Sequence, residues 1–452
     1  MKSLSGYELT LLGLFAATLL LGGASAAGFA GNLALQIAAL AVLAFALATG
    51  RVGRVPNRGL ALWFMALAGV LLLQFLPLPP MIWSALPGRE GVASGFEMLG
   101  LKGMPWQQWS LAADRSLASM TWWLPPLALF LLMLDDRGPD SWRAAWVASA
   151  VAVASIALGA LQRLGGGAGY LYRVTNDGFG VGFFANTNHQ ASFMLCVLAL
   201  ITGLYASAVS APRRQRGIGP AFYWAAVSLL VVGVLLSGSL AGMLLLIPVG
   251  LACALMLWRN IALNRWTVLA AALGALAIIA FMWLAPIEND LRDGAQAIAG
   301  ISRRDFLDKG LIIARDFAPV GTGLGTFSLI YPWYEQFDQV TPTFVNHAHN
   351  DVLEVLIELG LPGAILMLAF AAIWARLSWA IWRARDNFGA MAGSIIVGTL
   401  LAHSFVDYPL RTAASASVFA LGLAMMIRPQ PVRGRSRREE RGPVEKAPMI
   451  AI

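Results

Sequence analysis

Residues 220–257 have the sequence PAFYWAAVSLLVVGVLLSGSLAGMLLLIPVGLACALML, which contains no charged side chain. A helix that crosses a bilayer needs about 20 apolar residues, so this stretch is too long for one membrane span. The segment Ser237–Ser239, Ser-Gly-Ser, interrupts it near the middle and favours a turn. We therefore predict two consecutive membrane-spanning helices, at 220–236 and 239–257.

The rest of the chain repeats this pattern. Of its 452 residues, 58% are hydrophobic and only 12% are charged, compared with about a quarter charged in soluble domains. We predict an all-α polytopic membrane domain of about 12 spans over residues 1–427, followed by a basic, disordered cytoplasmic tail at 428–452. The spans are expected near 8–27, 31–50, 59–78, 117–134, 144–162, 187–208, 220–236, 239–257, 266–285, 352–375, 388–406 and 412–427.

The basic residues predict the orientation of these spans. With the N-terminus in the cytoplasm, about two thirds of the 32 Lys and Arg residues fall in the tail and in short loops on one side, as the positive-inside rule requires. This bias accounts for the net charge of +8, which therefore gives no support for nucleic-acid binding. Three outer segments are too long to be connectors, about 79–116, 163–186 and 286–350, and we expect the functional site there.

The strongest polar motif closes the third outer segment, where Asn-His-Ala-His-Asn at 346–350 precedes an apolar helix. Asp351 and Glu354 resemble a capping box at the start of that helix. The partial positive charge of a helix N-terminus disfavours imidazolium, so a neutral His349 could act as a general base, and Glu354 could orient a histidine. The alternative is a capped helix with two interfacial histidines, His347 and His349.

All four histidines fall on the predicted outer side. His189 follows Asn188 at the start of a helix, where both side chains could bind substrate or serve only the helix cap. His403 and Asp407 share one face near the outer end of a later helix. This one-sided distribution favours a site over scattered core histidines.

Arginine residues could bind the phosphate groups of a substrate. Arg303 and Arg304 precede the Gly-rich run PVGTGLGTF at 319–327, and Arg173 lies in the second outer segment. The planar guanidinium pairs bidentately with phosphate, so it can take the place of a metal ion on a diphosphate. The Gly-rich run lacks the lysine of a phosphate-binding loop, so we expect a plain turn.

Metal and disulfide chemistry have little support. Glu288, Asp290 and Asp293 are close enough in sequence to share a hard cation, although a solvated acidic loop is the commoner arrangement. Cys196 and Cys253 lie inside apolar runs, which excludes a disulfide framework and a cysteine zinc site. We expect neither a metal nor a cofactor.

From about residue 60 to residue 425 the chain resembles the O-antigen ligase and polymerase superfamily of bacterial envelope glycosyltransferases. The resemblance rests on LPLPPMIWSALPG (76–88), GFFANTNHQASF (182–193), PVGTGLGTF (319–327), HAHNDVLEVLIELGLPG (347–363) and HSFVDYPL (403–410). It implies a C-type glycosyltransferase-like fold in the bacterial inner (cytoplasmic) membrane, with the active site facing the periplasm. It also implies metal-independent transfer of a glycan from an undecaprenyl-diphosphate carrier to an acceptor glycolipid, glycan or protein, in lipopolysaccharide or exopolysaccharide synthesis.

By position, the resemblance implies that His349 is the functional histidine and that Arg304 and Arg173 bind the diphosphate. Two positions depart from the family pattern: Leu240 stands where relatives often carry Arg, and Asp308 replaces a usual aromatic residue. The expected catalytic residues are His349, His347 and Glu354, and the expected substrate-binding residues are Arg304, Arg173, Arg303, Asn188, His189, Asn350, His403 and Asp407.

The expected chemistry follows from the location. No ATP is present outside the cytoplasm, so the energy must lie in the donor, and a sugar diphosphate supplies both the energy and a leaving group. Arginines would stabilise that leaving group and a histidine would deprotonate the acceptor hydroxyl. Beside a ligase, three alternatives remain open: a polymerase of lipid-linked repeat units, a protein O-oligosaccharyltransferase and, from another class, a transporter or flippase.

Overall fold

The computed structural model describes residues 5–25, 29–101, 103–165, 169–211, 218–258, 303–336 and 345–428. Within these ranges, seven helices are long and apolar enough to cross a membrane, and four shorter helices are also apolar. Together they coincide with the predicted spans except that at 266–285, which lies outside the described residues, as does nearly all of the predicted tail. The prediction of a helical polytopic membrane protein is confirmed at this level.

The stretch at 220–257 forms two helices, as predicted. Gly238, with φ of 68°, ends the first, and the Ser239 hydroxyl caps the second by accepting a hydrogen bond from Gly242 N at 3.0 Å. The apolar helices are α1 (Gly6–Leu21), α2 (Ala30–Ala48), α3 (Arg58–Leu73), α6 (Ala113–Thr121) with α7 (Leu124–Met133), α8 (Ser141–Leu164), α9 (Thr187–Ser210), α10 (Pro220–Ser237), α11 (Leu240–Leu257), α15 (Asp351–Ala384), α16 (Phe388–His403) and α17 (Ala413–Ile427).

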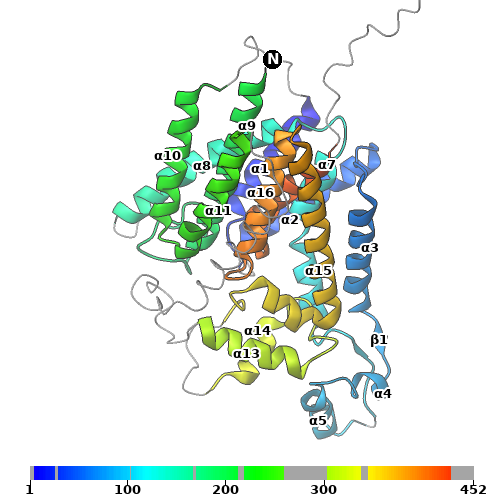
Figure 1. The fold of residues 1–452 in the computed structure, drawn as a ribbon. Helices are drawn as coiled ribbons and strands as arrows, with labels where there is room; N and C mark the ends of the chain where they lie inside the picture. Colours follow the sequence, from blue (N-terminus) through cyan, green and yellow to red (C-terminus); the bar gives the residue numbers. More distant parts are fainter. Residues whose placement is uncertain are drawn as a thin grey trace, which may run out of the picture.

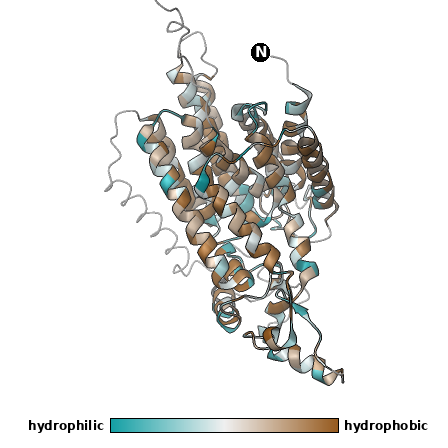
Figure 2. Ribbon diagram, turned by 90° about the vertical axis from the view of Figure 1, so that its right-hand side faces the viewer, coloured by the Kyte–Doolittle hydropathy of each residue, from teal (hydrophilic) through white to brown (hydrophobic). Residues whose placement is uncertain are grey.

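Helix α9 lies in the interior of this bundle (Figure 1). In its most apolar window 83% of the residues are buried, compared with 22% for α2. It packs against α8, α10, α11 and α16. Most of the ribbon is apolar, with polar residues concentrated toward the ends of the helices (Figure 2). The buried polar residues of α9 must therefore find partners on neighbouring helices.

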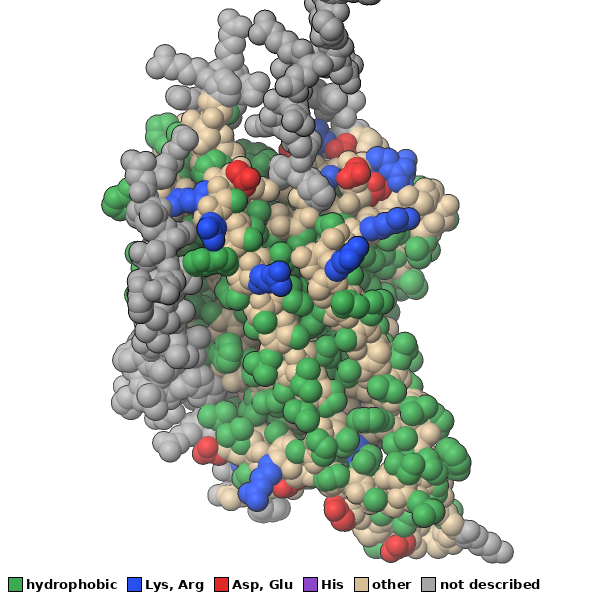
Figure 3. Space-filling model, turned by 45° about the vertical axis from the view of Figure 1, so that its right-hand side comes forward, with side chains coloured by type: hydrophobic (Ala, Val, Ile, Leu, Met, Phe, Trp, Pro, Cys, Tyr) green, Lys and Arg blue, Asp and Glu red, His purple; other side chains and the backbone are tan. Residues whose placement is uncertain are grey.

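The two ends of the bundle differ. The N-terminus lies at one end, which we call the terminus side (Figure 1). The opposite end, the outer side, carries α4 (Pro80–Trp83), α5 (Glu90–Met98), α13 (Arg303–Asp316), α14 (Phe327–Ile330) and the 3-10 helix η3 (Tyr331–Tyr334). In space-filling view a hydrophobic band separates charged side chains at the two ends (Figure 3). The all-α prediction needs one small correction, because β1 (Pro77–Leu78) pairs antiparallel with β2 (Gln107–Gln108).

Helix α15 is broken near its outer end. Gly360 has a φ of 57° and a ψ of −143°, which interrupts the helix between a short outer part and a long apolar part. A Cβ atom there would overlap Pro319 O, so only glycine fits. The predicted capping box is wrong: Asn350, not Asp351, is the N-cap, and its side chain accepts a hydrogen bond from Leu353 N at 3.0 Å.

Candidate functional site

The Gly-rich loop at 319–327 supplies backbone hydrogen bonds that α15 lacks at its break. Pro362 has no N–H, and Leu361 N donates to Pro319 O at 2.8 Å, so the carbonyls of Ile357 and Glu358 lose their donors within the helix. The loop replaces these donors: Thr322 N bonds to Ile357 O at 3.0 Å and Gly323 N bonds to Glu358 O at 2.8 Å. This run is a turn, as predicted, and it fixes the outer part of α15.

Three carboxylates of α15 converge on one arginine. Asp351, Glu354 and Glu358 lie on one face of the outer part of α15, and Arg411 belongs to the 3-10 helix η5 (Pro409–Arg411). Arg411 lies 3.4 Å, 3.2 Å and 3.1 Å from their respective oxygens. Burial alone would lower the pKa of Arg411, but the three carboxylates raise it above its ordinary value, so the guanidinium stays charged.

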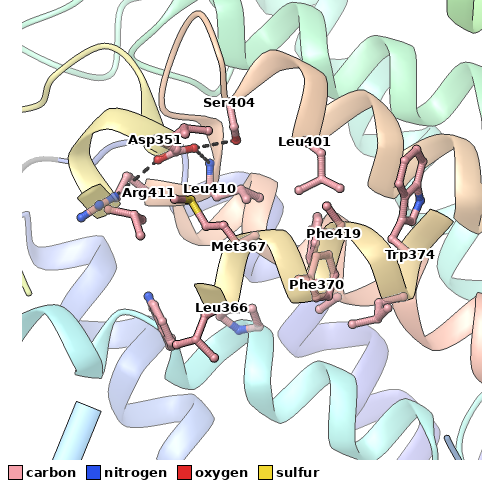
Figure 4. A pocket seen from close by; sticks show the side chains of 18 of the residues that line it. Asp351, Leu366, Met367, Phe370, Trp374, Leu401, Ser404, Leu410, Arg411 and Phe419 are labelled. Carbon is pink, nitrogen blue, oxygen red and sulfur yellow. Dashed lines mark hydrogen bonds and ion pairs between the residues drawn. The ribbon is translucent and has the colours of Figure 1, made fainter. Parts of the chain in front are cut away.

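The same carboxylates bind the surrounding backbone and His347. Glu354 Oε1 lies 2.9 Å from His347 Nδ1, and Glu354 Oε2 accepts from Ala348 N at 2.9 Å. Glu358 Oε1 accepts from Phe327 N at 3.4 Å, and Asp351 Oδ2 accepts from the Ser404 hydroxyl at 2.8 Å. Figure 4 shows Asp351 between Arg411 and Ser404. The cluster thus joins the histidine segment, the Gly-rich loop, η5 and the end of α16.

One tyrosine contacts three of the four histidines. The ring centroid of Tyr408 lies 5.1 Å from that of His189, 4.5 Å from that of His347 and 5.0 Å from that of His349. Burial, with a contribution from Asp407, raises the pKa of Tyr408, so it is a neutral phenol. The predicted gathering of histidines on one side is therefore a true cluster, although its centre, Tyr408, was not predicted.

His349 and His347 differ in the partners of their ring nitrogens. His349 Nδ1 lies 3.5 Å from Asp407 Oδ1, and its side chain keeps 14% exposure. His347 Nδ1 lies against Glu354, and its Nε2 is shielded from solvent and has no hydrogen-bond partner among the described residues. His349 adopts a φ of 50°, which turns the chain just before the N-cap of α15. The two side chains are nearly equally exposed, at 14% for His349 and 12% for His347.

Asp407 joins His349 to helix α9. The N-cap of α9, Asn186, donates from its side chain to Asp407 Oδ2 at 3.1 Å, and His189 Nε2 lies 3.8 Å from the same oxygen. The Asn186 side chain also accepts from Asn188 N at 2.8 Å. Three motifs that are far apart in sequence therefore meet at one buried carboxylate.

Other predicted site residues are engaged inside the protein. The Ser239 hydroxyl donates to Asn188 Oδ1 at 2.6 Å, and Asn350 donates to Phe405 O at 2.8 Å. His403 is fully buried, and its Nδ1 lies 2.5 Å from the Ser192 hydroxyl. These bonds position the cluster; that Asn188, Asn350 and His403 touch a substrate stays a prediction.

The structure describes the predicted arginines only in part. Arg173 is exposed in the second outer segment. Arg303 and Arg304 begin α13, but their side chains lie outside the described atoms. Two residues further along α13, the Phe306 ring lies 5.3 Å from the His349 ring. The start of α13 therefore lies next to His349.

A long cavity opens beside the carboxylate cluster. It has a volume of about 1990 Å³. Its outer end is lined by polar groups that include Arg115, His347, Glu354 and Arg411, although not by His349. From Asp351 and Arg411 the wall continues along α15, α16 and α17 through apolar side chains (Figure 4). The labelled apolar residues are Leu366, Met367, Phe370, Trp374, Leu401, Leu410 and Phe419.

In the described ranges, no three or more His, Cys, Asp or Glu side chains are placed so that they could hold a metal ion. The alternative cation site at Glu288, Asp290 and Asp293 lies outside them. The carboxylates of α15 instead contact Arg411 and His347.

Comparison with known proteins bears directly on this arrangement. Residues 225–368 match the family described as O-antigen ligase. The matched segment contains the Gly-rich loop, the histidine motif and the outer part of α15, and it confirms the resemblance to the O-antigen ligase and polymerase superfamily. It supports glycan transfer in O-antigen assembly. No curated protein sequence matches the chain.

Proposed function

Because residues 225–368 match the O-antigen ligase family, we propose that the chain transfers a glycan from an undecaprenyl-diphosphate carrier to an acceptor at the periplasmic face of the bacterial inner membrane. The observation that carries the proposal is the cavity, which has an apolar wall and a polar outer end beside the histidine cluster. A lipid-linked donor has the same division, with an apolar tail and a charged, glycosylated head.

His349 is the proposed base. Asp407 faces Nδ1 of its ring at 3.5 Å, which leaves Nε2 on the opposite edge for the acceptor hydroxyl. The carboxylate fixes the ring and stabilises the imidazolium that forms. In this role Asp407 positions the base rather than binding the substrate.

The step balances without a further reactant. The acceptor oxygen forms a bond to the anomeric carbon, its proton passes to His349, and the sugar–phosphate bond breaks with inversion. The diphosphate leaves on the lipid carrier with the electron pair. Arg304 and Arg173 stabilise its charge, while Glu354 holds His347 at the cavity wall.

A reconstituted assay tests the proposal. Purified full-length protein in vesicles, supplied with lipid-linked donor and acceptor, should form product without an ion gradient. His349→Ala and Arg304→Ala should each abolish transfer while the protein stays folded, and Arg376→Ala, exposed on α15 toward the terminus side, should retain it. Full turnover by either site variant would refute the site, and gradient-dependent movement of donor without transfer would indicate a transporter.

The identity of the acceptor distinguishes a polymerase, a ligase and a protein-glycosylating enzyme. Envelope glycans from a deletion strain would contain short-chain polysaccharide if the protein is a polymerase. Full-length lipid-linked polymer that remains unattached would indicate a ligase, which we favour. An unglycosylated protein would indicate protein O-glycosylation.

A further inference from the structure

The cavity extends well beyond its polar outer end. On the terminus side it is lined by Arg54, between α2 and α3, and by Trp382 and Arg383 near the end of α15. Along the unbroken part of α15, the lining residues Gly363 and Arg383 are separated by roughly 30 Å at 1.5 Å per residue. This length matches the ~30 Å of a hydrocarbon core, so the cavity runs along most of the expected membrane thickness.

The terminus-side end has its own charges. Arg54 and Arg383 are both exposed, and neither forms an ion pair with any side chain in the described ranges. By contrast, Arg411 at the outer end is already paired with three carboxylates. Two cations with no counter-ion among the described residues, at the mouth of an apolar cavity, are complementary to an anionic amphiphile.

The wall at this end is built for a lipid headgroup region. Trp374 and Trp382 donate to Ser394 O at 3.2 Å and to Ser394 Oγ at 2.8 Å, which ties α15 to α16. Arg385 donates to Trp258 O at 2.8 Å and so ties α15 to the end of α11. Tryptophan and arginine are the residues that anchor a protein at the membrane interface.

We propose that the terminus-side half of the cavity binds an anionic glycerophospholipid of that leaflet, with its phosphate between Arg54 and Arg383 and its acyl chains along α15. The tail of a donor held at the outer end carries no charge that could meet these two arginines. The phosphate site is therefore distinct from the diphosphate end of the donor, and its test does not depend on the proposed glycan transfer.

Lipid selectivity tests the headgroup contact. The full-length protein is placed in phosphatidylcholine vesicles with a small proportion of spin-labelled phosphatidylglycerol or spin-labelled phosphatidylcholine, and the immobilised fraction of each is measured. Arg54→Gln with Arg383→Gln should lower the preference for phosphatidylglycerol by roughly fivefold for each arginine removed. The matched control, Arg58→Gln with Arg376→Gln, makes the same charge change outside the cavity lining and should leave the preference unchanged.

A second variant tests the acyl-chain contact without a change in charge. Ala371 lines the cavity, and Ala371→Trp should fill it and remove the preference, provided the variant elutes as one species with unchanged helical circular dichroism. An equal loss of the preference for phosphatidylglycerol in the two double variants would show that basic residues at this end attract the lipid wherever they lie. That result would overturn the site. An unchanged preference in Arg54→Gln with Arg383→Gln, or in a folded Ala371→Trp, would overturn it as well.

Discussion

Arg411 is the residue on which the outer end of the cavity depends most. Its side chain is 16% exposed and faces three carboxylates, so Arg411→Leu would leave their charges uncompensated. We expect a loss of roughly 3–5 kcal/mol in the free energy of unfolding, measured by detergent-titrated unfolding. Arg411→Lys should lose less, because it keeps the charge but not the two bonds to Glu358.

The control is Arg376→Leu, which removes an exposed arginine with no ion pair in the described ranges and should change stability by no more than about 0.5 kcal/mol. An Arg411→Leu protein as stable as this control would contradict the charge cluster. The sequence could not predict the cluster, because Arg411 and Glu358 are 53 positions apart. Spacing alone indicated only that the carboxylates share a helix face.

A substitution of Asp407 tests whether this residue positions His349 or binds the substrate. Asp407→Asn should lower transfer by roughly 10–100-fold, as expected for loss of a group that orients a functional histidine. Because a positioning group acts on the histidine and not on the substrate, the loss should appear in kcat, with KM little changed. A loss that appears mainly as a raised KM would contradict the assignment; Asp316→Asn, on α13 beside Tyr334, is the control.

At the scale of elements, the break in α15 carries the next prediction. Gly360→Ala would place a Cβ atom against Pro319 O at a positive φ, so it should destabilise the protein by roughly 1–3 kcal/mol and impair transfer. Gly250→Ala in α11, where a Cβ would meet nothing within 4 Å, should be neutral or stabilising. Equal melting temperatures for the two variants would contradict this account.

The helices themselves were predictable, since the apolar stretches and the Ser-Gly-Ser turn near Gly238 are local signals. The start of α15 was not, because Asn350 and Asp351 are both good caps and the choice depends on tertiary contacts. Asp351 is taken up by Ser404 and Arg411, which leaves Asn350 to cap the helix. Local capping rules could not include these partners.

At the scale of the whole molecule, the predicted orientation can be tested by labelling. Cys196 and Cys253 are buried, so they should react little with a membrane-impermeant maleimide. Glu97→Cys, on α5 at the outer side, should be labelled in spheroplasts, and Asp386→Cys, between α15 and α16, only after lysis. The opposite pattern would reverse the topology and exclude a periplasmic site.

The interior position of α9 also constrains how the protein enters the membrane. Gln190 and Ser192 are buried on this helix, and lipid would leave such groups without partners. The Ser155 hydroxyl of α8 donates to Gln190 at 2.8 Å, and Thr202 lies 3.3 Å from the Tyr223 hydroxyl of α10. We therefore expect α9 to leave the translocation machinery together with α8 and α10, as one inserted unit.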